Sequence, residues 1–130
     1  MGSRYDVKCA RCGNEFSVNE GGGFFFHLLH CDSCGEELSV GFDEIGEAHL
    51  RYLKGLPGPY CVASSESDEF VRDNYPGEPL SEEEYHKAVQ QIVGACGCGG
   101  SFKFDAPPKC PKCGSTELEY DPRGASLMYD

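Results

Sequence analysis

Closely paired cysteines are the residues of this sequence that could do chemistry. Nine cysteines occur in 130 residues, and eight of them fall into four pairs separated by one or two residues. A glycine follows the second cysteine of every pair, and it allows the chain to adopt a turn conformation that is closed to other residues. Such a turn can direct both sulfurs to the same side. The pairs are Cys9 and Cys12, Cys31 and Cys34, Cys96 and Cys98, and Cys110 and Cys113.

The sequence context favours metal-binding thiolates over disulfides. The first residues, Met1 to Asp6, lack the apolar core of a secretory signal, and no apolar stretch is long enough for a membrane helix. We therefore expect a cytoplasmic protein with no membrane segment, in a compartment where thiols stay reduced. An odd number of cysteines also argues against a complete set of disulfides.

Distance along the chain divides the pairs into two four-cysteine sites. The 18 residues between Cys12 and Cys31 fall within the range of zinc sites built from two such pairs. The later pairs are separated by 11 residues, which is shorter than that range, and one of them is a Cys-x-Cys pair. An alternative for this second site leaves one cysteine free and takes His86 as a ligand. The predicted sites are Cys9, Cys12, Cys31 and Cys34, followed by Cys96, Cys98, Cys110 and Cys113.

The chemistry expected of these sites is structural metal binding. Four thiolates in a tetrahedron suit zinc or iron, and closed four-cysteine sites are typical of structural zinc. We expect two zinc ions, with a rubredoxin-like iron electron carrier as the alternative. A closed site has no open position for water, and the sequence has no recognisable catalytic motif, so we expect no enzyme activity.

The cysteine turns and their flanking strands resemble the zinc-ribbon group, which shares its metal-binding turns with rubredoxin. The resemblance covers Cys9 to Cys34 and Cys96 to Cys113. It implies that each segment forms two short hairpins around one zinc. The second segment is also similar to the zinc module of nickel chaperones for hydrogenase maturation. Those chaperones carry an N-terminal Met-His nickel site, whereas this chain has Gly2, so the resemblance does not extend to nickel delivery.

The remaining sequence predicts a small, metal-stabilised α+β protein with two zinc β-ribbons flanking a helical insert. A helix is expected over about 43–54, and a capping box of Ser81 and Glu84 predicts another over 82–93. The acidic residues 64–79 are expected to be a loop, and the tail after Pro122 to be irregular. Alternating apolar residues predict short strands at 5–8, 15–18, 37–40, 101–104 and 116–120. The predicted parts are residues 1–41, 42–94 and 95–130.

The charge of the chain limits the partners that it could bind. A formal net charge of −11 argues against direct binding of nucleic acid, because nucleic-acid binders neutralise phosphates with Lys and Arg. We expect a protein partner, whose basic surface would complement this charge.

Phe24, Phe25 and Phe26 either fill a thin core or form an exposed binding surface.

Two further functions stay open at this point. Zinc ribbons are common in transcription and translation machinery, so the chain could be a factor that docks on such an assembly. It could also be a redox or metal-handling protein that uses labile thiolates or Cys61. We expect Cys61 to be a buried, unreactive thiol, since no neighbouring base in the sequence would activate it.

Overall fold

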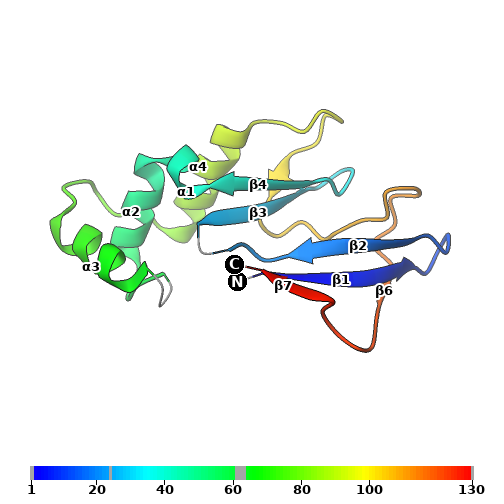
Figure 1. Cartoon of the computed structure of the whole chain (residues 1–130). Helices are drawn as coiled ribbons and strands as arrows, with labels where there is room; N and C mark the ends of the chain where they lie inside the picture. Colours follow the sequence, from blue (N-terminus) through cyan, green and yellow to red (C-terminus); the bar gives the residue numbers. More distant parts are fainter. Residues whose placement is uncertain (1, 24, 61–63, 130) are drawn as a thin grey trace. The chain divides into compact units, whose positions relative to one another are not determined.

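The chain folds into two compact units, described here from a computed structural model (Figure 1). The structure describes residues 2–23, 25–60 and 64–129. One unit combines Met1–Val40 with Gly94–Asp130, and the other consists of Gly41–Val93. The first unit carries antiparallel sheets and the second carries helices, so the chain is a small α+β protein, as the sequence predicted.

The first sheet is built around β1 (Gly2–Cys9), which is antiparallel to all its neighbours. β2 (Glu15–Glu20) pairs along one edge, while β6 (Leu118–Tyr120) and β7 (Leu127–Tyr129) pair along the other (Figure 1). Val7 of β1 and Val18 of β2 are both buried. Alternate residues of a strand point to the same face, and the pairing of Val7 with Phe16 places Val7 and Val18 on the same face of the sheet.

The C-terminal tail was predicted to be irregular, and this prediction is wrong for β7. The Tyr129 hydroxyl donates a hydrogen bond to the Gly21 carbonyl at 2.8 Å. Its ring also stacks on Phe26, with the ring centroids 6.1 Å apart. A strand of three residues is too short to show an alternating pattern in the sequence. β7 is recognised only from its contacts with residues far away along the chain.

The second sheet places β3 (Phe26–Cys31) between β4 (Glu37–Gly41) and β5 (Phe102–Lys103). The apolar run before Cys31, which the sequence left unassigned, is therefore a central strand with Leu29 fully buried. β5 comes from the C-terminal part of the chain, as do β6 and β7 in the first sheet. Residues 1–41 and 95–130, expected to form separate ribbons, thus contribute strands to the same two sheets.

The helical unit contains α1 (Phe42–Ile45), α2 (Glu47–Gly55), α3 (Ser65–Asn74) and α4 (Glu82–Val93). α4 has the predicted bounds, and the capping box is confirmed. The Ser81 amide donates to the Glu84 carboxylate at 3.3 Å, and the Glu84 amide donates to the Ser81 hydroxyl at 3.2 Å. The helix expected over 43–54 is divided at Gly46, whose φ of +69° is incompatible with a continuous helix.

The prediction of a loop over 64–79 is wrong, because α3 occupies most of this segment. The acidic side chain of Asp68 is buried there. It accepts hydrogen bonds from the Tyr60 amide at 2.7 Å and the Ser64 hydroxyl at 2.8 Å. Local donors therefore compensate the burial of a charged group that composition alone would place in solvent.

An aromatic cluster with His49 at its centre forms the interior of the helical unit. His49 is buried and stacks on Phe42, with the ring centroids 3.9 Å apart. Its Nδ1 lies 2.9 Å from the hydroxyl of Tyr85, which in turn stacks on Tyr52 at 4.0 Å. Burial lowers the pKa of His49 to about 4, so the ring is neutral at physiological pH.

No helix in the described part of the chain has the length and apolar character needed to cross a bilayer.

Candidate metal centres

The eight paired cysteines converge into two groups of four sulfur atoms, and each group draws on both ends of the chain. Within each group all the sulfur atoms lie within 4.8 Å of one another. The first cysteine of every pair is buried and the second is exposed. Site 1 consists of Cys9, Cys12, Cys110 and Cys113, and site 2 consists of Cys31, Cys34, Cys96 and Cys98.

This grouping corrects the one expected from the sequence, which joined pairs that are neighbours along the chain. Cys9 is the last residue of β1 and pairs with Leu118 of β6, so the turn before β6 is brought to it. Cys31 is the last residue of β3 and pairs with Phe102 of β5, which brings the turn before β5 to site 2. Strand pairing between the two ends, rather than distance along the chain, therefore decides which cysteines meet.

Three of the four cysteine turns share one backbone arrangement. In each, the amide of the first cysteine donates to the carbonyl five residues later, and the glycine amide donates back to the first cysteine. These glycines have φ values of +74° to +79°, which other residues adopt only with strain. The first set of bonds is Cys9 to Asn14 at 2.8 Å, Cys31 to Glu36 at 2.8 Å and Cys110 to Ser115 at 2.9 Å.

The fourth turn, which contains Cys96 and Cys98, closes one residue sooner. The Cys96 amide donates to the Gly100 carbonyl at 2.8 Å, and the Gly99 amide donates to the Cys96 carbonyl at 2.9 Å. Gly100 packs so closely on site 2 that an added Cβ would lie 2.7 Å from the Cys31 sulfur. The Cys-x-Cys pair is therefore accommodated by a shorter turn and by a glycine with no room for a side chain.

The sulfur positions fit a tetrahedral metal ion. Sulfurs from facing turns are 3.5 Å and 3.6 Å apart in site 1 (Cys9 to Cys113, Cys12 to Cys110). In site 2 they are 3.5 Å and 3.7 Å apart (Cys31 to Cys98, Cys34 to Cys96). A tetrahedron with metal–sulfur bonds of about 2.3 Å has sulfur–sulfur edges of about 3.8 Å. Both groups thus have the size required by a four-thiolate metal centre.

Hydrogen bonds from backbone amides favour the thiolate form of some of these cysteines. The Cys34 amide, 3.4 Å from the Cys31 sulfur, is the main cause that lowers the pKa of Cys31 to about 6. Burial opposes ionisation of Cys110, but the amides of Cys113 and Lys112 lower its pKa to about 6.

Other sulfurs of the same groups resist ionisation. The Ser115 amide lowers the pKa of Cys113, yet burial and the adjacent sulfurs raise it to about 12. Thiolates this close repel one another, so the four sulfurs of a group ionise together only around a cation.

No histidine among the described residues belongs to either cysteine group. His30 is buried beside Cys31, with its Nε2 3.8 Å from a carboxylate oxygen of Glu37. His27 is also buried and meets the edge of Phe104, with the ring centroids 5.2 Å apart. His86, the alternative ligand for the second site, pairs instead with Glu82 on α4 at 3.8 Å. Cys61 lies outside the residues that the structure describes.

The fold and both cysteine groups fall within a recognised family. A family model matches residues 5–119 of the chain. The chain belongs to the family described as Domain of unknown function (DUF8255). The matched part of this DUF8255 protein includes all eight clustered cysteines and the helical unit. No curated protein and no solved structure matches the chain. The function of this DUF8255 protein must therefore be argued from its sites.

Gly100 offers a selective test of site 2. We expect Gly100→Ala to weaken metal binding at site 2 by roughly 10–100-fold, the range seen when groups supporting metal ligands are lost, and to spare site 1. Gly97→Ala in the same turn is the matched control, because an added Cβ there meets nothing within 4 Å. Cobalt titration followed by visible absorption would measure both sites. Equal binding by the two variants would contradict the proposed packing of Gly100.

Proposed function

We propose that this DUF8255 protein binds two zinc ions as structural cross-links, one in each four-cysteine group, and acts as a protein-interaction module. The observation that carries the proposal is the convergence of four sulfurs in each of two groups, with separations of 3.5–3.7 Å between sulfurs of facing turns. Closed four-cysteine sites are characteristic of structural zinc. A closed site leaves no position for a reactive water, which supports a binding role over catalysis.

The short C-terminal strands support the structural role of the metals. β5 has two residues and β6 has three, so few ladder hydrogen bonds hold the C-terminal segment in the sheets. Strands of this length are not stable without further packing or cross-links. Site 1 would attach the segment before β6 to β1, and site 2 would attach the segment before β5 to β3. Each zinc would supply stability that the small apolar core of so short a chain does not provide.

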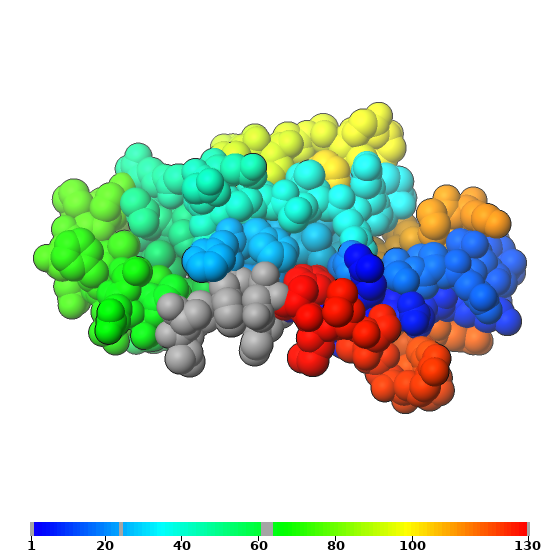
Figure 2. All heavy atoms as spheres, in the orientation of Figure 1, coloured from blue at the N-terminus to red at the C-terminus, as the bar shows by residue number. Residues whose placement is uncertain are grey.

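An apolar surface in the sheet unit supports the proposed interaction. Met128 of β7 is 72% exposed and Leu127 is 52% exposed, and Figure 2 shows β7, in red, lying open on the surface. Leu127 borders a cavity of about 380 Å³ that also includes Phe26 and Tyr129. Of the three phenylalanines singled out in the sequence, Phe26 packs on Tyr129, Phe25 is 72% exposed, and Phe24 lies outside the described residues.

The proposed occupant of this surface is a basic protein segment with apolar side chains. The net charge of −11 favours association with a positively charged protein and opposes direct contact with nucleic acid. Apolar and aromatic side chains at the centre of an interface supply most of its binding energy. Phe25 and Met128 would provide these contacts.

Metal analysis of freshly purified protein tests the structural part of the proposal. We expect two zinc ions per chain, no visible colour, and loss of the sheet unit's dispersed NMR signals when a strong chelator removes the metal. Retention of those signals without metal would contradict the structural role. Bound iron with a red colour would replace zinc binding with electron transfer as the leading function.

Paired substitutions test the interaction surface. We expect a Phe25→Ala, Met128→Ala double variant to lose a basic protein partner that the unmodified chain retains in affinity purification. Phe70→Ala is the control, since this side chain is 68% exposed but belongs to the helical unit. Recovery of nucleic acid alone, or a partner retained equally by the double variant, would contradict the proposed surface.

A further inference from the structure

The two sites differ at one equivalent position. Asn14 and Glu36 each lie two residues after the second cysteine of their turn. Their carbonyls accept the same hydrogen bond, from the Cys9 and Cys31 amides respectively, both at 2.8 Å. The backbone thus places an amide side chain beside site 1 and a carboxylate side chain at the matching place beside site 2.

Each of these side chains faces a sulfur from the opposite turn. The Asn14 amide donates to the Cys110 sulfur at 3.8 Å. A carboxylate oxygen of Glu36 lies 3.3 Å from the Cys96 sulfur. The two sulfurs also correspond, because Cys110 lies 3.6 Å from Cys12 and Cys96 lies 3.7 Å from Cys34. The same thiolate position is therefore supported by a donor in site 1 and opposed by an acceptor in site 2.

This difference changes how firmly a metal is held. A four-thiolate centre around a divalent ion has a net charge of −2, so a hydrogen-bond donor stabilises its thiolates and a nearby carboxylate repels them. A carboxylate oxygen is also a ligand for zinc in its own right. Glu36 is exposed at the edge of the site, with its carboxylate in contact with the Cys96 sulfur. It can compete with Cys96 for the metal.

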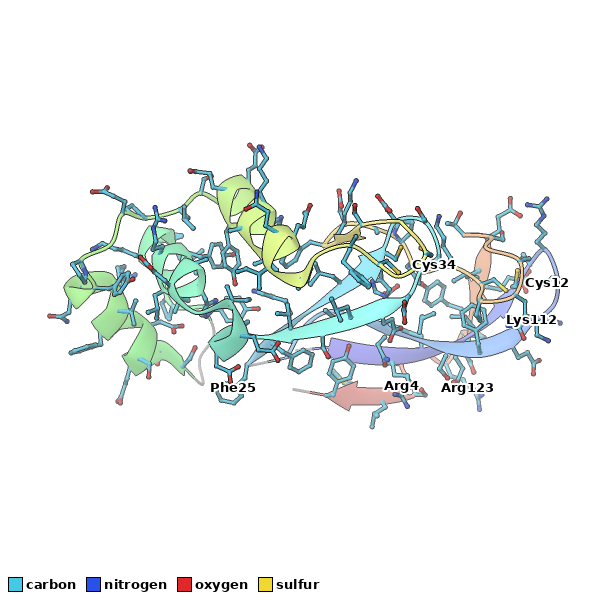
Figure 3. All side chains as sticks on the ribbon, turned by 90° about the horizontal axis from the view of Figure 1, so that it is seen from above. Arg4, Cys12, Phe25, Cys34, Lys112 and Arg123 are labelled. Carbon is cyan, nitrogen blue, oxygen red and sulfur yellow. The ribbon has the colours of Figure 1, made fainter. Side chains whose placement is uncertain are left out.

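The charges within the turns differ in the same direction. Arg11 and Lys112 lie between the cysteines of site 1, and Figure 3 shows Lys112 beside Cys12. In the Cys31 turn of site 2 the position equivalent to Arg11 holds Ser33, and the residue before it is Asp32. The two lysines near site 2 contact Asp32 of this turn. Lys103 pairs with the Asp32 carboxylate at 3.2 Å, and Lys109 donates to the Asp32 carbonyl at 2.8 Å.

We propose that site 2 is an exchangeable metal site, in which Glu36 replaces Cys96 as a ligand and allows the metal to pass to an external thiolate ligand. Site 1 holds its metal more firmly and releases it more slowly. In the exchange, the zinc–sulfur bond to Cys96 would break as a zinc–oxygen bond to Glu36 forms. Incoming thiolates would then displace Glu36 and the three other cysteines one bond at a time, with no change in oxidation state. The inference rests on the proposed binding of two zinc ions, and it adds a metal-handling role to the structural one.

Zinc release from the full-length, zinc-loaded protein tests this inference. The protein is mixed with excess 4-(2-pyridylazo)resorcinol, which reports released zinc by colour, and the free thiols are then alkylated with N-ethylmaleimide and mapped by mass spectrometry. We expect two release phases of one zinc each. Cysteines alkylated after the fast phase should be those of site 2, namely Cys31, Cys34, Cys96 and Cys98.

Reciprocal substitutions connect the rates to the proposed residues. Glu36→Asn, which gives site 2 the residue of site 1, should slow the fast phase by about tenfold, the lower end of the effect of groups that support ligands. Asn14→Asp should accelerate the slow phase. Glu15→Gln is the control for net charge, because this exposed carboxylate neighbours Asn14 and makes no contact with sulfur among the described hydrogen bonds.

The outcomes separate this inference from the proposed function. Alkylation of site 1 first, equal release rates at both sites, or a Glu36→Asn variant that releases zinc like Glu15→Gln would overturn it. A protein purified with one zinc, and with the site 1 cysteines protected from alkylation, would support it. Absence of zinc from both sites would overturn the proposed function and this inference together.

Discussion

The convergence of cysteines from the two ends of the chain is the constraint on which the proposed account of the sheet unit depends. Its C-terminal segment contributes only short strands, and its core is a small set of residues that includes Val7, Val18 and Leu29. Burial of so few side chains recovers little of the conformational entropy lost when the segment is ordered. Metal ions bound at the two cysteine groups would each join β1 or β3 to the C-terminal segment, shorten the free chain and fix the register of the added strands.

The same requirement explains the local sequence around the cysteines. A four-thiolate centre needs each turn to present two sulfurs on one side, and this demands a left-handed residue such as Gly13 or Gly35 after the second cysteine. Amides of the turn then point at the first sulfur, as the Cys34 amide does at Cys31. Backbone geometry thus supplies both the shape of the site and part of the stabilisation of its charge. This geometry does not fix the side chains just outside the turns, and the two sites differ there, with Asn14 beside site 1 and Glu36 beside site 2.

The sequence predicted those features that are determined within a few residues. The glycine after each pair, the strands beside the turns and the capping box of α4 are local signals, and the structure confirms them. It did not predict the division of the cysteines into sites, because this depends on the pairing of β1 with β6 and of β3 with β5, far apart along the chain. α3 was missed for a different reason: acidic composition favoured an exposed loop, whereas Asp68 is buried and accepts hydrogen bonds from Tyr60 and Ser64.

Metal content of two fourfold Cys→Ser variants tests the shared sites most directly. One variant replaces the complete site 1 set, Cys9, Cys12, Cys110 and Cys113, and the other replaces the N-terminal set, Cys9, Cys12, Cys31 and Cys34. The account predicts one bound metal in the first variant, where site 2 is intact, and none in the second, where each site has lost half of its ligands. Cobalt spectra would identify the surviving four-thiolate centre. One metal in the second variant and none in the first would show that each end of the chain binds its own metal, and would contradict the account.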